Sequence, residues 1–198
     1  MRSLLEAVSY FREYDKLANI SEIARRYFAM NAFDGVLTII GVLMGNFVAN
    51  VSDARIVLST GLATCVAMGV SGLWGAYLTE SAERKRDLDE LSKVTLTDMT
   101  NTRIGRASRA AIVIVAVVDG LSPLMAALIV LIPFFVAGNS QDLTWAYYTA
   151  IGLALLALFG LGLFLGSISK GRMIIYGLKT VLAGVVSIII SFFLGVSG

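Results

Sequence analysis

The chain has 198 residues, of which 57% are hydrophobic and only 15% are charged, and its net charge is +2 with no histidine. Soluble domains hold closer to a quarter charged residues, so the composition excludes an ordinary soluble globular protein. The absence of histidine removes the commonest metal ligand and general base. The single cysteine, Cys65, excludes an internal disulfide and is expected to be a packing residue.

The first thirty residues predict a helix that does not cross the membrane. Apolar side chains alternate with charges there at helical spacing, which is typical of an amphipathic helix lying on a membrane surface. The alternative is a solvated helix packed on a cytoplasmic loop. We assign residues 1–31 to this cytoplasmic or interfacial amphipathic helix. Asn19 followed by Glu22 resembles a capping box, which predicts that a helix restarts here and leads into the first span.

Five apolar blocks follow, each long enough for a transmembrane helix, which needs about 20 mostly apolar residues. The blocks are 32–52, 56–80, 108–136, 143–169 and 174–196. They predict an all-α, multi-pass integral membrane protein with a five-helix transmembrane domain over residues 32–198. Charge pairs at helical spacing extend the second helix beyond the membrane, into a basic cytoplasmic loop over 81–107 that includes a turn near 95–101.

Basic residues lie almost entirely on one side of these spans. Of the sixteen lysines and arginines, only Arg55 falls on the other side. Cytoplasmic loops carry the excess of basic residues, so the N-terminus is predicted to be cytoplasmic. For a prokaryotic source the expected location is the cell membrane. Trp145, Tyr147 and Tyr148 then fall at the outer interface, as an aromatic belt would.

Small residues form stripes along several spans. Gly162 and Gly166 in the fourth block, and Gly184 and Gly195 in the fifth, are spaced to lie on one helix face. Such faces let neighbouring helices approach closely. We interpret these stripes as helix-packing surfaces.

An aspartate followed by glycine occurs twice within membrane-length apolar sequence, at Asp34-Gly35 and Asp119-Gly120. The stretch from Ala110 to Gly138 contains no other charge. A carboxylate that faces lipid costs about 3 kcal/mol or more, so the default interpretation is a functional group in a polar cavity. Two such acids in a chain without histidine indicate a pathway for cations or protons.

Asp34 lies near the predicted cytoplasmic edge of its span, eight residues after Arg26. One interpretation is a purely interfacial role near a helix N-terminus, where negative charge is favoured. The other places Asp34 at the cytoplasmic mouth of a cation path. On helical spacing, Thr38, Gly41 and Gly45 share its face.

Asp119 lies deeper and has the stronger physical argument. Pro123 follows four residues later and has no amide to bond the carbonyl of residue 119. One residue therefore offers a carboxylate and a freed carbonyl, with Gly120 and Ser122 adjacent. Transporters use broken helices with unwound carbonyls to coordinate cations at the midplane. The alternative is a kinked helix whose aspartate pairs with a serine or threonine across the bundle.

These groups define a candidate metal site. Asp34 and Asp119 are predicted to act as carboxylate ligands or proton carriers, and four further residues supply secondary polar groups along the path: Thr38, Ser71, Ser122 and Glu80. Carboxylates, hydroxyls and carbonyls suit hard ions such as Mg²⁺, Mn²⁺ and Fe²⁺ better than copper or zinc.

Several short motifs, in order and spacing, resemble the vacuolar iron transporter family. They are Asn31–Thr38 (NAFDGVLT), Gly41–Gly45 (GVLMG), Gly75–Ser81 (GAYLTES), Ala127–Phe134 (ALIVLIPF) and Gly177–Gly184 (GLKTVLAG). The resemblance covers about residues 30–196 and agrees with five spans and a cytoplasmic N-terminus.

The resemblance implies a homodimeric transporter of divalent cations, iron or manganese, in exchange for protons. Asp34 matches the family's pathway aspartate in the first helix. The chain departs from the family in its second helix, where Met68, Gly72 and Ala76 replace the usual Asp, Met and Glu. It also lacks the glutamate-rich cytoplasmic domain that typical members insert after that helix.

The expected partners are therefore the lipid bilayer, divalent cations, protons and a second copy of the chain, but no nucleic acid. No permanently bound cofactor is expected, only the transported Fe²⁺ or Mn²⁺. Enzymatic activity is not expected, since no nucleophile and base pair is evident. The alternative function is a non-transporting membrane protein whose basic cytoplasmic face recruits partners or anionic lipid.

Overall fold

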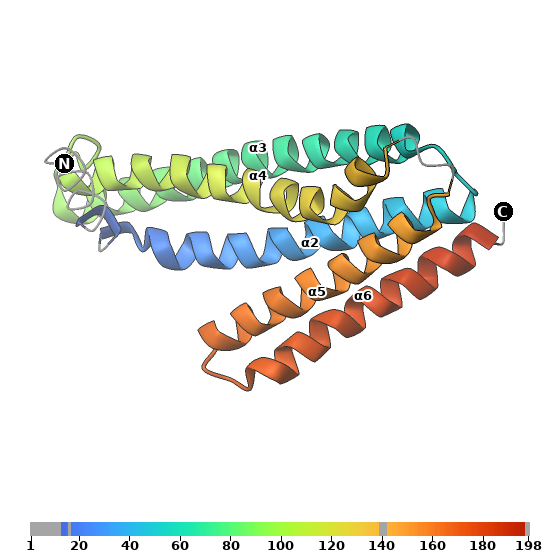
Figure 1. Ribbon diagram of the computed structural model, residues 1–198. Helices are drawn as coiled ribbons and strands as arrows, with labels where there is room; N and C mark the ends of the chain where they lie inside the picture. The colour runs from blue at the N-terminus through green and yellow to red at the C-terminus, as the bar shows by residue number, and fades with distance from the viewer. Residues whose placement is uncertain (1–12, 16, 139–141, 197–198) are drawn as a thin grey trace, which may run out of the picture. The chain divides into compact units, whose positions relative to one another are not determined.

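The structure is a computed structural model that describes residues 13–15, 17–138 and 142–196. Its five long helices are α2 (Ile20–Val48), α3 (Ala54–Thr95), α4 (Arg103–Ala137), α5 (Thr144–Ile168) and α6 (Met173–Val196) (Figure 1). No strand occurs among the described residues. All five helices are long and apolar enough to cross a membrane, so the predicted all-α protein with five transmembrane helices is confirmed.

Three helices are longer than the apolar blocks that predicted them: α2 and α4 begin earlier, and α3 ends later. α2 begins at Ile20, twelve residues before the apolar block that starts at residue 32. The segment 81–107, predicted as a loop with an extended helix, is mostly helical, because α3 continues to Thr95 and α4 begins at Arg103. Only residues 96–102 form the turn between them. The helices therefore continue past the membrane-length apolar sequence.

The restart of the helix at Ile20 is confirmed, but its cap is not the predicted one. Asn19 adopts a left-handed backbone conformation (φ 49°), which separates α2 from the helical residues 17–18. The Ser21 amide donates a hydrogen bond to Asp15 Oδ1 at 2.6 Å. Asp15 therefore caps α2, in place of the predicted Asn19 and Glu22 pair. Residues 1–12 and 16 of the predicted amphipathic helix lie outside the described residues.

The chain divides into two compact units. Unit 1 comprises Met1–Phe28 and Val70–Leu121, and unit 2 comprises Ala29–Gly69 and Ser122–Gly198. The division falls within α2, α3 and α4, each of which contributes residues to both units. Asp34 and Asp119 therefore belong to different units.

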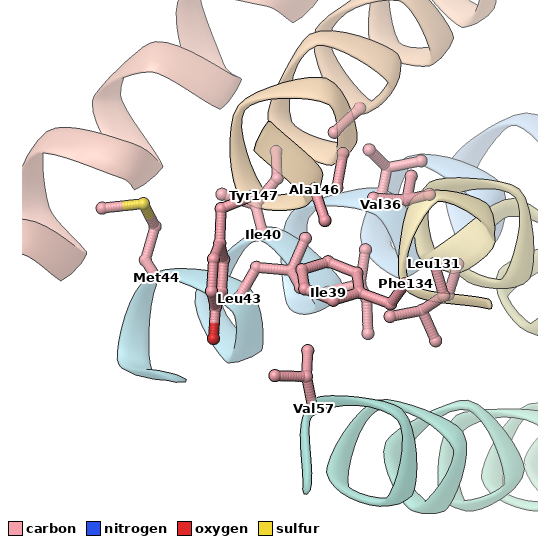
Figure 2. Packing of buried hydrophobic residues seen from close by; sticks show 14 of the residues in the cluster. Val36, Ile39, Ile40, Leu43, Met44, Val57, Leu131, Phe134, Ala146 and Tyr147 are labelled. Carbon is pink, nitrogen blue, oxygen red and sulfur yellow. The ribbon is translucent and has the colours of Figure 1, made fainter. Parts of the chain in front are cut away.

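The main apolar core lies in unit 2 and is built around α2. Val36, Ile39, Ile40 and Leu43 are fully buried on one side of this helix, as its helical period requires (Figure 2). Residues of α3, α4 and α5 complete the cluster. Burial of these aliphatic side chains supplies the stabilising contacts of the unit.

Two aromatic residues complete this core. Phe134 of α4 is fully buried, and its ring packs edge-on against Tyr147 of α5 at 4.9 Å between centroids. The Tyr147 hydroxyl donates to the carbonyl of Val51 at 3.0 Å. Tyr147 thus turns inward, whereas Trp145 and Tyr148 remain exposed as predicted for interfacial aromatics.

Helices α5 and α6 lie side by side along unit 2 (Figure 1). A Cβ atom at Gly162 would collide with Thr180 Oγ1 and the backbone of Gly177, and one at Gly184 would collide with Leu158. Thr180 Oγ1 also donates to the Leu158 carbonyl at 2.7 Å. The small-residue stripes of these two helices are therefore packing surfaces, as predicted.

Candidate functional site

Asp34 lies on the one outward-facing strip of its helix segment. Between Ala29 and Val48, α2 exposes Met30, Asp34, Thr38 and Gly45, with Gly41 half-buried on the same side. We call these five residues the outward stripe of α2. The predicted polar face of Asp34 and Thr38 is therefore present and is exposed within the described part of the chain. A Cβ atom at Gly41 or Gly45 would meet nothing within 4 Å.

Gly35 explains why Asp34 points outward. A Cβ atom at Gly35 would lie 2.6 Å from both the Cα and the carbonyl oxygen of Pro123. Only glycine therefore lets the α4 backbone approach α2 this closely. Because successive residues of a helix are about 100° apart, the contact at Gly35 directs Asp34 away from α4.

Asp119 is buried in unit 1, with 5% of its surface exposed. A Cβ atom at Gly72 of α3 would lie 3.0 Å from the Asp119 carbonyl oxygen and 3.3 Å from Gly120 Cα. α4 is helical throughout Arg103–Ala137, including both prolines. The predicted unwinding around Asp119 is therefore absent, and the carbonyl of this residue packs against the glycine of the neighbouring helix.

Asp119 is not an isolated group. It interacts with other parts of the described chain. Tyr27, Glu80 and Asp119 lie on α2, α3 and α4 respectively, all within unit 1. Together with Arg84 we call these residues the polar region of unit 1.

Glu80, predicted as a secondary ligand, is engaged by a cation. Arg84 Nε lies 3.0 Å from Glu80 Oε2, with side-chain exposures of 11% and 5%. The Arg84 guanidinium also donates to the carbonyl of Ala18 at 3.4 Å. A buried carboxylate requires a partner of opposite charge, and Arg84 fulfils this need while tying α3 to the residues that precede α2.

The two remaining predicted residues differ in exposure. Ser71 is exposed on α3 in unit 1, whereas Ser122 is buried on α4 in unit 2. The structure thus places Asp34 and Thr38 on one stripe, and Glu80 and Asp119 within unit 1. Within the described residues, no three His, Cys, Asp or Glu side chains gather closely enough to hold a metal ion.

Sequence reasoning missed two members of the polar region. Arg84 follows Glu80 by four residues, a spacing at which opposite charges pair on a helix, so this partner could have been found. Tyr27 gave no comparable signal, because an aromatic residue at the start of a span is most simply an interfacial anchor.

A small pocket lies in unit 2 at the start of α5. Its walls are formed by Phe47, Asn50, Val51, Ser52, Asp142, Leu143, Thr144 and Tyr147. The Thr144 amide donates to Asp142 Oδ1 at 2.8 Å, and the hydrogen bonds from Thr144 lower the pKa of Asp142. The polar groups of this pocket therefore serve local capping, and we assign it no ligand.

Two comparisons relate the chain to known proteins. A sequence model of the VIT family matches residues 87–196, which include the end of α3 and all of α4, α5 and α6. The chain is also 31% identical over 176 residues to an uncharacterized protein of the archaeon Methanocaldococcus jannaschii, an alignment that covers 87% of this chain and 88% of that protein. Asp119 lies inside the family match and Asp34 precedes it.

Proposed function

Because this chain belongs to the VIT family, a family of membrane metal-ion transporters, we propose that it transports a divalent cation, Fe²⁺ or Mn²⁺, in exchange for protons. We also propose that it works as a homodimer with the N-terminus in the cytoplasm. The observation that supports this proposal best is the outward stripe of α2, where Asp34 and Thr38 lie uncovered in an apolar helix.

An uncovered carboxylate on a spanning helix has to be accommodated. Facing lipid it would cost about 3 kcal/mol or more, and Asp34 remains exposed among the described residues. A second copy of the same stripe resolves this, since Gly41 and Gly45 leave room for a close approach of two α2 helices. Two Asp34 carboxylates and two Thr38 hydroxyls then line a polar path between the copies.

The chemistry of the stripe fits the proposed ions. Carboxylate and hydroxyl oxygens are hard ligands that suit Mn²⁺ and Fe²⁺, and the Met30 thioether on the same stripe adds one softer group. A carboxylate that binds a cation can also bind protons, so the two compete for the same oxygen atoms. This competition couples movement of the metal ion to movement of protons.

The other candidate residues have supporting roles in this proposal. Asp119 is a buried carboxylate that carries protons, with Ser122 one turn further along α4. Ser71 contributes an exposed hydroxyl, and Glu80 holds Arg84 in place unless that ion pair opens. This assignment is consistent with the lack of a three-ligand group among the described side chains.

Transport by the purified chain in proteoliposomes tests the proposal. We expect uptake of Fe²⁺ or Mn²⁺ that responds to a pH gradient, and we expect Asp34→Asn to lower it by roughly tenfold or more, because the amide has no charge to offer a cation. The matched control is Asp89→Asn, which removes one exposed carboxylate on the extension of α3 beyond the apolar sequence.

Asp119→Asn separates the proposed proton transfer by Asp119 from the proposed metal binding by Asp34. We expect this variant to lose the dependence of uptake on the pH gradient while still binding the metal ion. Uptake by Asp34→Asn at the level of Asp89→Asn would refute the proposed path. No uptake of any divalent cation by the wild-type protein, in either direction of the gradient, would refute transport itself.

A further inference from the structure

One face of α4 in unit 1 changes character within a single turn. Arg106 and Arg109 are exposed there, and the same face continues with Val113, Val117 and Leu121, whose exposures are 56%, 41% and 50%. These residues recur every three or four positions, so they follow one side of the helix. A pair of guanidinium groups therefore sits at the end of a bare aliphatic strip.

The two arginines differ from the other arginines near them. Arg84 is paired with Glu80, Arg86 with Glu90, and Arg103 with Glu13. Arg106 and Arg109 form no ion pair or hydrogen bond through their side chains with any other described residue. Their positive charge is not balanced by a neighbouring carboxylate in the described part of the chain.

Their position on the helix adds to this imbalance. α4 begins at Arg103 and has no acidic residue in its first turn. The N-terminal end of a helix carries a partial positive charge that favours anions and disfavours cations. Arg106 lies in this first turn, and an anion from outside the chain would balance its charge.

We propose that this face of α4 binds an anionic phospholipid. The Arg106 and Arg109 guanidinium groups bind the phosphate, for which the planar fork of arginine is well matched. One acyl chain lies along Val113, Val117 and Leu121. The twelve residues from Arg109 to Leu121 span about 18 Å at the helical rise, close to the roughly 15 Å of one hydrocarbon leaflet.

This geometry favours a lipid over a soluble anion or a protein partner. A free phosphate would use the guanidinium groups but not the aliphatic strip. The strip has the length and polarity of a lipid contact, and the charges lie at one end of it, where the headgroups of a leaflet are found. The inference rests on unit 1 alone and does not depend on the transported ion.

The test measures lipid selectivity of the full-length protein in phosphatidylcholine bilayers. Spin-labelled phosphatidylglycerol and phosphatidylcholine report the fraction of each lipid held at the protein surface. Two matched double variants remove two positive charges each: Arg106→Gln with Arg109→Gln, and Lys85→Gln with Lys93→Gln, whose lysines are exposed on α3 beyond its apolar part.

We expect the wild-type protein to prefer phosphatidylglycerol and the double arginine variant to lose that preference by at least roughly fivefold, since a basic residue near an anionic surface contributes about that factor. The double lysine variant should keep it. Equal loss in both variants would overturn the proposal, because it would reflect net charge alone, and so would a wild-type protein without preference.

Two further arms complete the experiment. Inorganic phosphate added at millimolar concentration should leave the preference for phosphatidylglycerol unchanged. If phosphate abolishes this preference, the arginines bind a soluble anion instead. Arg106→Lys with Arg109→Lys keeps both charges and should retain most of the preference. Loss as complete as with glutamine would also overturn the proposal, because lysine still binds phosphate.

Discussion

The two Asp-Gly pairs have the same sequence but opposite exposure. In both, the glycine lies where two helix backbones meet: Gly35 against Pro123 in unit 2, and Gly120 near Gly72 in unit 1. Asp34 is exposed, whereas Asp119 is 5% exposed. The glycine therefore explains the packing in each pair, and the aspartate is free to differ.

This difference shows that a carboxylate inside a span can be stabilised in two ways. A buried acid such as Asp119 finds its partners within its own chain, and an exposed one such as Asp34 requires something from outside. The first is accommodated by polar neighbours, as Glu80 is by Arg84. The second points to an interface.

The largest effect is expected for cross-linking between copies. In a Cys65→Ala background, Thr38→Cys should form a disulfide-linked dimer on mild oxidation, because the proposed dimer would bring the two Thr38 Cα atoms within the roughly 4.4–6.8 Å that a disulfide spans. Ser122→Cys, which is buried, should give none. The yield is measured by non-reducing gel electrophoresis.

Random collision is controlled by Leu182→Cys, on the exposed side of α6. If its yield equals that of Thr38→Cys, or if neither Thr38→Cys nor Gly45→Cys links the copies, the outward stripe is not an interface and Asp34 would need a different explanation.

Gly35→Ala should be clearly destabilising. Its new Cβ atom would lie 2.6 Å from the Pro123 backbone, which has no flexible side chain to move aside, and overpacking of this kind costs about 1–3 kcal/mol. Thermal unfolding in detergent should therefore show a clear fall in Tm. Gly152→Ala is the control, since a Cβ atom there meets nothing within 4 Å. An equal Tm for both variants would argue against the close contact of α2 and α4.

Gly72→Ala should have a smaller effect of the same sign. The new Cβ atom would lie 3.0 Å from the Asp119 carbonyl oxygen, so a shift of a few tenths of an ångström relieves the clash. Alanine also favours a helix over glycine by about 1 kcal/mol, which offsets part of the cost. We expect at most half the loss in Tm of Gly35→Ala. A loss as large as that of Gly35→Ala would mean that the α3 and α4 backbones cannot move apart at all.

Much of the fold could be predicted from the sequence, since apolar blocks of membrane length can hardly form anything but spanning helices. The extensions of α2 and α3 past the apolar blocks were also predicted, from the Asn19 and Glu22 pattern and from charge pairs at helical spacing. Tyr147 departed from expectation: the sequence shows it beside Trp145, but only packing decides which aromatic ring turns inward against Phe134.

The candidate site was only partly predictable for a related reason. Periodicity placed Asp34 and Thr38 on one face, and the structure agrees. Whether a face is covered depends on tertiary contacts, which is why the exposure of Asp34 could not be foreseen. The burial of Asp119 agrees with the expectation that a carboxylate within a span avoids lipid. The effect of Pro123 was overestimated, since α4 stays helical through it and the freed carbonyl packs against Gly72.

The smallest expected effect concerns an aspartate outside the spans. Hydrogen bonds from the Ser21 hydroxyl and amide lower the pKa of Asp15 from its usual 3.8. A carboxyl whose pKa is lower in the folded state adds stability above its unfolded pKa and loses it as the pH falls through the folded one. The cap of α2 should therefore be intact at neutral pH, begin to weaken below about pH 4, and be lost only as the pH falls through the lowered pKa of Asp15.

Hydrogen exchange at the Ser21 amide, corrected for its intrinsic pH dependence, measures this effect. Protection should fall by up to roughly fivefold between about pH 6 and pH 3, because one helix cap contributes about 1 kcal/mol to helix stability. Asp15→Asn keeps an oxygen acceptor but cannot titrate, so its protection should not change with pH. Unchanged protection in the wild-type chain would mean that Asp15 does not hold the start of α2. The restart at Asn19 would then depend on Arg84, which donates a hydrogen bond to the Ala18 carbonyl and is also paired with the buried Glu80.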